Sequence, residues 1–300
     1  MWVVRSWVGG LLAAVSCSLF LFINYTVSVH GVLSTLVEDD SLTPWGLASL
    51  IGFQWLWGFA LWSYVQTMLS NPGTTPKLRP PADLPADQVL TCSECKQWKP
   101  PRTHHCSNCE RCVHKMDRHC FWINNCIGAL NLKFYMLFLL YLTGACAVAV
   151  SVLGYDGMFY ATSNKRYHLR PGPILCGAFS LLICLFLMFL GCGLLLEQWS
   201  NLHRNQTSLE SLQKNQPRPV MSTQRSFHRV WCRVFGKAAV LWWLPVTPLI
   251  RPHYKEVLKR RRGKFSSKDV DAVCWSVTFG FLLVVIAVCL GYLVYQLYRK

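Results

Sequence analysis

The stretch HKMDRHCFWINNCIG, residues 114–128, decides how this chain is organised. It places Cys120 directly after His119 and two residues after Arg118, at the end of a segment that carries seven of the fifteen cysteines. Long apolar runs lie on both sides of that segment. A thiol in this position can be a zinc ligand, a structural thiol or a nucleophile. The residues around it indicate which of these roles it has.

Composition argues against a soluble protein. Hydrophobic residues make up 52% of the chain and charged residues only 15%. A helix needs about 20 apolar residues to cross the hydrocarbon core of a bilayer. The first run is longer than the apolar core of a signal peptide, which is about 7–15 residues. The runs of sufficient length cover residues 7–33, 46–69, 134–155, 174–196 and 273–298.

The basic residues indicate which side of the membrane each loop occupies. Segments 71–133 and 197–272 contain nine and fifteen Lys and Arg residues, whereas loops 34–45 and 156–173 contain none and three. Short cytoplasmic loops are enriched in Lys and Arg, so both basic segments are expected in the cytoplasm. The run 273–298 has no charged face, which favours a fifth spanning helix over a helix lying on the membrane surface.

The net charge of +16 would suit a nucleic-acid-binding protein if the basic residues formed a patch on a soluble domain. Here they are confined to the loops between apolar runs, as membrane topology requires. We therefore expect no nucleic-acid partner. The bilayer itself, through its anionic headgroups, and phosphorylated small molecules are the electrostatic partners that this distribution favours.

The cysteine-rich segment has the composition of a zinc-binding domain. A cytoplasmic segment keeps its thiols reduced, which argues against a disulfide framework. Structural zinc takes four tetrahedral thiolate or imidazole ligands, often from Cys-x2-Cys turns. Eight residues suffice for two sites of three Cys and one His, and Cys120 is then left over as a spare thiol or a nucleophile. The eight are Cys92, Cys95, His105, Cys106, Cys109, Cys112, His119 and Cys126.

The segment CSECKQWKPPRTHHCSNCERCVHKMDRHCFWINNCIGALNLKFY resembles the cysteine-rich domain of the DHHC-type protein S-acyltransferases, or palmitoyltransferases. Three further motifs extend the resemblance over most of residues 1–250. NPG at 71–73 resembles the Asp-Pro-Gly of the family, and TSLE at 207–210 resembles its Thr-Thr-x-Glu. WCRVFG followed by WWLP resembles the amphipathic C-terminal region.

The resemblance implies a role for each residue of the site. Cys120 would be the nucleophile that accepts a fatty acyl chain from acyl-CoA, the co-substrate, and passes it to cysteines of membrane-associated substrate proteins. Asp117 would orient the catalytic base. The two structural zinc ions would be held by Cys92, Cys95, His105 and Cys112, and by Cys106, Cys109, His119 and Cys126.

The sequence departs from the family pattern at one catalytic position. The tetrad Asp-His-His-Cys reads Asp117-Arg118-His119-Cys120, and arginine cannot act as a general base because it stays protonated. One hypothesis is that the Arg118 charge stabilises the Cys120 thiolate and leaves a slow enzyme. The alternative is that Arg118 pairs with Asp117 in a non-catalytic membrane scaffold that binds partner proteins. A RING-type ubiquitin ligase, the third class, requires a more widely spaced ligand set.

The sequence therefore predicts an α-helical polytopic membrane protein with four core transmembrane helices and a fifth near the C-terminus. A small cytoplasmic two-zinc domain lies between the second and third helices, in an endomembrane (ER or Golgi) or the plasma membrane. The expected divisions are 1–70 and 134–196 for the two helix pairs, 71–133 for the catalytic zinc domain, 197–272 for the basic segment and 273–300 for the last helix and tail.

Overall fold

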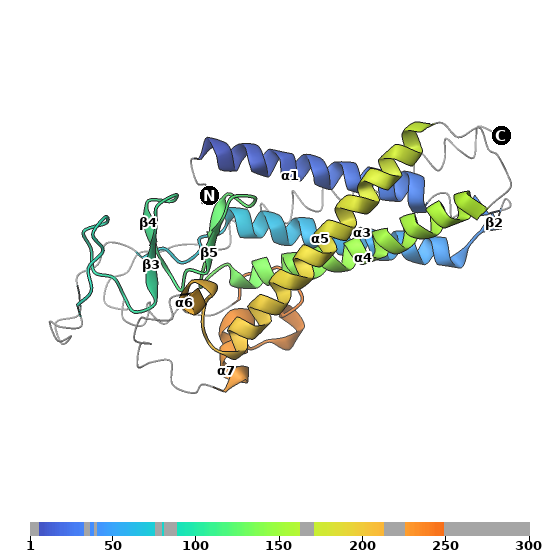
Figure 1. Ribbon diagram of the computed structural model, residues 1–300. Coiled ribbons are helices and arrows are strands. Elements are labelled where there is room, and N and C mark those ends of the chain that lie inside the picture. Colours follow the sequence, from blue (N-terminus) through green and yellow to red (C-terminus); the bar gives the residue numbers. More distant parts are fainter. Residues whose placement is uncertain are drawn as a thin grey trace. The chain divides into compact units, whose positions relative to one another are not determined.

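A computed structural model describes residues 6–32, 37–38, 41–75, 80, 89–162, 171–212 and 226–248. The predicted fifth helix, 273–298, and the basic run 258–268 lie outside the described residues. Four long helices carry most of the described chain (Figure 1). They are α1 (Trp7–Thr26), α3 (Pro44–Leu69), α4 (Leu132–Thr162) and α5 (Pro171–His203).

The remaining elements are short. A π-helical turn, η1 (Val27–Val32), continues α1, and the strands β1 (Val37–Glu38) and β2 (Ser41–Leu42) pair before α3. The cysteine-rich segment contains β3 (Thr103–Cys106), β4 (Arg111–His114), β5 (Arg118–Cys120) and β6 (Asn125–Ile127). After α5 come α6 (Ser208–Leu212), α7 (Phe227–Phe235) and the 3-10 turn η4 (Ala239–Leu241).

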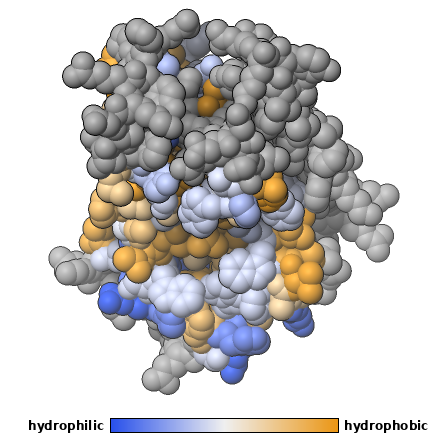
Figure 2. All heavy atoms as spheres, turned by 90° about the vertical axis from the view of Figure 1, so that its right-hand side faces the viewer, coloured by the Kyte–Doolittle hydropathy of each residue, from blue (hydrophilic) through white to orange (hydrophobic). Residues whose placement is uncertain are grey.

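Three helical segments among the described residues are long and apolar enough to cross a membrane. They cover Trp7–Val29, Leu132–Met158 and Gly172–His203. The helix α3 forms over 26 residues, as predicted, but this Trp-rich helix is not among the three. Figure 2 shows hydrophobic side chains open to the surface on one face of the molecule, as expected of a protein surrounded by lipid. The structure thus supports a helical membrane protein.

The chain divides into two compact units, one of which contains residues 15–62 and 138–194 among the described part. Aromatic side chains pack its helices together. Phe20 of α1 lies 4.8 Å from Trp57 of α3 and 6.4 Å from Phe138 of α4, measured between ring centroids. A buried polar chain joins α1 and α3, because Asn24 donates to Gln54 (3.1 Å) and Gln54 donates to Ser28 (2.7 Å).

The other unit contains the described residues of 1–14, 63–137 and 195–273, and with them the whole candidate site. The NPG turn leads from α3 into its zinc-binding segment. The Asn71 side chain accepts from the backbone N–H groups of Gly73 (2.8 Å) and Thr74 (2.9 Å). Gly73 has a φ of +107°, a conformation that favours glycine.

The same unit holds the C-terminal motif against the beginning of α4. Lys133 is buried, and its ammonium group donates to the carbonyls of Leu241 (2.7 Å) and Val246 (3.0 Å). A buried charge has to be compensated by hydrogen bonds, so these two carbonyls fix the segment that follows α7. Trp231 of α7 stacks on Phe235 with ring centroids 4.1 Å apart.

Candidate active site and metal centres

Two β-hairpins bring the ligand-type side chains of the cysteine-rich segment together. β3 pairs with β4 in antiparallel register, and His105 lies opposite Cys112. β5 pairs with β6, and His119 lies opposite Cys126. Directly opposed residues of an antiparallel pair have side chains on the same face, with Cβ atoms about 4.5–5.5 Å apart. Each hairpin therefore supplies one histidine and one cysteine to the same group.

A Cys-x2-Cys turn completes each group. In both groups the ligand atoms, one for each residue, lie within 4.8 Å of one another. The membership is the one that the family resemblance implied. The first group contains Cys92, Cys95, His105 and Cys112, and the second contains Cys106, Cys109, His119 and Cys126.

The distances in both groups suit a tetrahedral zinc ion. In the second group Nδ1 of His119 lies 3.7, 3.3 and 3.6 Å from the sulfurs of Cys106, Cys109 and Cys126. In the first group the sulfurs of Cys95 and Cys112 are 3.7 Å apart. With Zn–S near 2.3 Å and Zn–N near 2.0 Å, a tetrahedral site has S···N edges of about 3.6 Å and S···S edges of about 3.8 Å. The two groups can therefore hold two zinc ions, whose binding would stabilise the small fold directly.

Cys120 belongs to neither group and lies on the opposite face of its strand from His119. Successive side chains of a strand point to opposite faces. On β5, His119 faces the second metal group, so Arg118 and Cys120 share the other face. The Cys120 side chain is partly buried. The hairpin thus separates a metal-binding face from a face that carries a free thiol.

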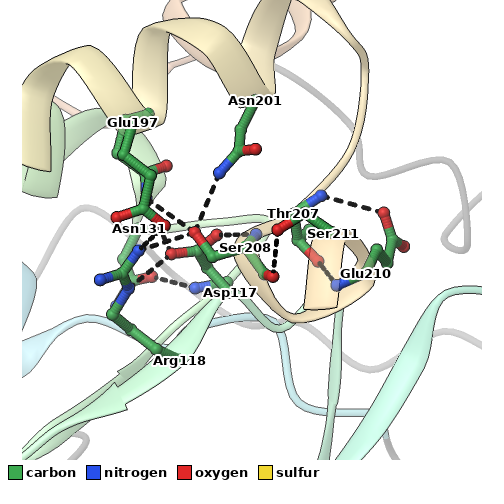
Figure 3. Close-up of polar contacts among 11 residues, drawn as sticks. Asp117, Arg118, Asn131, Glu197, Asn201, Thr207, Ser208, Glu210 and Ser211 are labelled. Carbon is green, nitrogen blue, oxygen red and sulfur yellow. Dashed lines mark hydrogen bonds and ion pairs between the residues drawn. The ribbon is translucent and has the colours of Figure 1, made fainter. Parts of the chain in front are cut away.

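Arg118 is held on that second face by three polar contacts (Figure 3). Its Nε donates to Asp117 (2.9 Å), and its Nη2 donates to Glu197 (2.7 Å) and Ser208 (2.7 Å). Asp117 is only 4% exposed in its side chain, whereas Glu197 is 40% exposed. The ion pair with Asp117 is therefore the one that solvent screens less.

Asp117 is surrounded by donors. Besides Arg118, its carboxylate accepts from the side chain of Gln198 (2.8 Å) and from the backbone N–H of Ser208 (2.6 Å). The resemblance predicted that Asp117 orients a catalytic base. In the structure the group that it orients is the guanidinium of Arg118.

Comparison with known proteins places this geometry in a family. Residues 86–215 match the family model described as DHHC palmitoyltransferase. Probable protein S-acyltransferase 12 of Arabidopsis thaliana is 34% identical over 74% of this chain and 81% of its own. Probable protein S-acyltransferase 13 of the same plant is 30% identical over 79% and 85%, and human palmitoyltransferase ZDHHC3 is 28% identical over 81% and 82%.

The chain belongs to the DHHC palmitoyltransferase family. The family confirms the predicted enzyme class, protein-cysteine S-palmitoyltransferase, and accounts for the cysteine-rich, zinc-binding type of segment between α3 and α4. The Asp-Arg-His-Cys tetrad of this chain is a variant of the motif from which the family takes its name.

In this DHHC protein the Arg118 charge acts on the Cys120 thiol in the expected direction, toward a lower pKa, but burial acts the other way and is larger. Burial raises the pKa of Cys120, and this effect outweighs the lowering by the backbone N–H groups of Ile123 and Trp122 and by the Arg118 charge. The contribution of Arg118 is the smallest of these causes. The guanidinium itself is paired with two carboxylates, those of Asp117 and Glu197.

The TSLE motif ties the site to the rest of the zinc segment. The Glu210 N–H donates to the Thr207 hydroxyl (3.2 Å) and the Glu210 carboxylate accepts from the Thr207 N–H (3.0 Å), which makes a capping box at the start of α6. Glu210 also binds Arg102 through two hydrogen bonds of 2.7 Å. The motif thus anchors α6 between Arg102 and Asp117.

Sequence reasoning missed two side chains of the site. Glu197 and Gln198, near the end of α5, contact Arg118 and Asp117 across about 80 residues of chain. The only signal was their position, because a charged residue that directly follows the apolar run 174–196 has to face something polar. Ser208 was noticed only as a departure from threonine, and it proves to accept from Arg118 and Asn201.

Proposed function

We propose that this chain is a protein S-acyltransferase that carries the fatty acyl group as a thioester on Cys120. The observation that supports this best is the position of Cys120. It is the one cysteine of the segment 92–126 that stands outside both metal groups. It follows His119, a ligand of the second group, on a strand that the second zinc ion would stiffen. Cys92, Cys95, His105 and Cys112 would hold one zinc ion, and Cys106, Cys109, His119 and Cys126 the other.

The reaction has two thioester exchanges. The Cys120 sulfur attacks the acyl-CoA carbonyl carbon, a new C–S bond forms, and the bond to the CoA sulfur breaks. The thiol proton leaves Cys120 and the CoA thiolate takes up a proton from water. A substrate cysteine then attacks the acyl-Cys120 thioester, which regenerates the Cys120 thiol.

The proton step is where this chain differs from a protein with histidine at position 118. Arg118 has no acceptor for the Cys120 proton. A positioned general base is typically worth about 100-fold to 10,000-fold in rate. We therefore expect slow acyl-enzyme formation, with Asp117 and Arg118 acting as a fixed ion pair that shapes the site.

The partners and compartment follow from the same proposal. Acyl-CoA is the donor, and the acceptors are cysteines on the cytoplasmic side of membrane-associated proteins. The zinc segment and the basic segment lie in the cytoplasm, where short loops concentrate Lys and Arg. An endomembrane, ER or Golgi, or the plasma membrane would carry the protein.

A second candidate function rests on the contact between Arg118 and Asp117. The 2.9 Å pair occupies the carboxylate that would otherwise orient a base. In a non-catalytic scaffold the zinc segment would bind partner proteins, and Cys120 would form no acyl adduct.

Mass mapping of the adduct separates the two functions. Detergent-purified protein is incubated with palmitoyl-CoA, digested and analysed with and without hydroxylamine, which cleaves thioesters. We expect a hydroxylamine-sensitive palmitoyl group on Cys120, absent from Cys120→Ser and unchanged in Cys232→Ser, a control that removes a partly exposed thiol of α7. Protein that contains two zinc ions and yet acquires no adduct on Cys120 would favour the scaffold.

A further inference from the structure

The turn that follows Cys120 is held by the last two turns of α3. Residues 121–124 form this turn between β5 and β6, and its backbone bonds run from Ile123 N–H to the Cys120 carbonyl (3.3 Å) and from Asn124 N–H to the Phe121 carbonyl (3.1 Å). The hydroxyl of Tyr64, on α3, donates to the Trp122 carbonyl (2.8 Å). This contact joins residues 58 positions apart in the chain.

The second attachment to α3 is on β6, the strand that pairs with β5. Asn125 is directly opposite Cys120 in the hairpin, and its amide donates to three carbonyls at the end of α3. The three distances are 3.0, 3.1 and 2.9 Å, to Thr67, Met68 and Ser70. The hairpin that carries Cys120 is therefore attached to the same helix at two points, one in the turn after Cys120 and one at the residue paired with it.

The two anchors differ in what they fix. Asn125 satisfies carbonyls that any helix leaves without partners at its C-terminus, so its contacts serve α3 as much as the hairpin. Tyr64 is almost completely buried, with 1% exposure, and its hydroxyl reaches the one peptide group that links Trp122 to Ile123. The N–H of that peptide belongs to Ile123 and donates to the Cys120 carbonyl, so the peptide is linked both to α3 and to the nucleophile residue.

Packing also holds the turn, because Ile123 and Asn124 are buried. The side chains of Phe121 and Trp122 are more open, at 46% and 54% exposure, and the Phe121 ring meets the His119 ring edge-on with centroids 4.9 Å apart. On the far side, Gly9 of α1 approaches so closely that a Cβ there would lie on the Asn124 side chain. The Tyr64 hydrogen bond adds a polar contact between the 122–123 peptide and α3.

We propose that Tyr64 is a positioning residue for the nucleophile: its hydroxyl holds the Trp122 carbonyl and thereby fixes the turn that directly follows Cys120. The inference rests on the proposed transferase function. A hydroxyl on a helix would in this way control a thiol that it does not touch, and acyl transfer would depend on how the zinc segment is attached to α3.

The test is the single-turnover rate of acyl-Cys120 formation in Tyr64→Phe, which removes one oxygen and keeps the ring. At saturating palmitoyl-CoA we expect the rate to fall about threefold to tenfold, the range expected for loss of one neutral hydrogen bond. The palmitoyl-CoA concentration that gives half the maximal rate should not change, and two zinc ions should remain bound. Tyr141→Phe, which alters a tyrosine of α4 in the other unit, is the matched control and should behave as wild type.

A conservative replacement separates hydrogen bonding from shape. Incorporation of 4-aminophenylalanine at position 64 restores a donor at the same place and should recover most of the lost rate. An unchanged rate in Tyr64→Phe, no recovery with the amino group, or loss of zinc from Tyr64→Phe would each overturn the proposal. Wild-type protein that forms no acyl-enzyme would instead contradict the proposed function, so the two failures are distinguishable.

Discussion

At the level of single side chains, Arg118 gives the Asp117 carboxylate an ion-pair partner in place of the base that it was expected to orient. A neutral histidine there would accept a proton, whereas arginine donates and remains charged. The surroundings are matched to this donor, because Glu197 and Ser208 both accept from Nη2. The substitution is therefore accommodated by a complete set of contacts, and the site is ordered around it.

The first prediction concerns Ser208. Its hydroxyl accepts from Arg118 and from the Asn201 amide, and the residue is buried. Ser208→Ala leaves these donors without their acceptor and should lower the free energy of unfolding by about 1–3 kcal/mol. Ser208→Thr keeps the hydroxyl and restores the residue typical of the family, so it should be close to neutral. Thermal unfolding in detergent compares the two, and equal losses would contradict the role given to the hydroxyl.

The second prediction concerns pH. Burial raises the pKa of Glu210, but the hydrogen bond and charge of Arg102 outweigh it and hold the pKa below its ordinary value. A folded-state pKa that is depressed gives stability that is present above the unfolded pKa of about 4.3 and is lost as pH falls through the folded value. Glu210→Gln should therefore be less stable than wild type at pH 7.

The difference between these two proteins should persist down to about pH 4.3 and shrink as the pH is lowered from there through the folded-state pKa. Unfolding midpoints of both proteins, measured at each pH under the same zinc concentration, give the comparison directly. A difference that stays constant across this range would mean that the Glu210 charge does not contribute. Loss of zinc at acid pH affects both proteins alike and cancels in the difference.

At the level of elements, the strand pairing explains why the neighbouring residues His104 and His105 have different roles. In β3, His105 faces Cys112 and belongs to the first metal group, whereas His104 lies opposite Val113 and belongs to neither group. His105→Ala or His119→Ala should each reduce bound zinc from two ions to one. His104→Ala, the matched control on the same strand, should keep both. Elemental analysis of the purified variants tests this, and zinc loss in His104→Ala equal to that in His105→Ala would contradict the assignment.

Gly128, which directly follows β6, lies against the NPG turn and gives a further prediction. A Cβ built on Gly128 would lie 2.4 Å from the Pro72 carbonyl oxygen and 2.7 Å from a Val113 methyl, so backbone would have to move. Gly128→Ala should therefore destabilise the zinc segment and increase its susceptibility to protease. Gly10→Ala is the control, because no atom lies within 4 Å of a Cβ at that helical position. Equal protease sensitivity of the two variants would contradict the close approach.

These elements also show what the sequence could and could not predict. The end of α3 at Leu69 was predicted, since Asn, Pro and Gly follow at once. α4 continues to Thr162, past the predicted end at 155, because Gly157 alone does not stop a helix. The hairpins were not predicted, since strands of three or four residues that alternate between ligands and polar residues lack the apolar periodicity of ordinary strands.

For the chain as a whole, the spacing of cysteines and histidines carried most of the functional information. The two metal groups could be named from the sequence because ligands of one ion must converge and the family motif fixes which ones do. The contacts of Glu197 and Gln198 could not, since they join the end of α5 to the tetrad through the fold. The larger effect of burial on the Cys120 pKa was also hidden, because burial depends on how the chain packs around the thiol.

The most direct test is the rate of acyl-enzyme formation in wild type beside Arg118→His. Both proteins, each with two zinc ions, are mixed with labelled palmitoyl-CoA and quenched over time, with Cys120→Ser as the blank. We expect a slow but complete hydroxylamine-sensitive label on wild type and a rate at least about tenfold higher in Arg118→His, since a general base is restored. Wild type that stays unlabelled while Arg118→His labels would contradict the account and make this family member a scaffold.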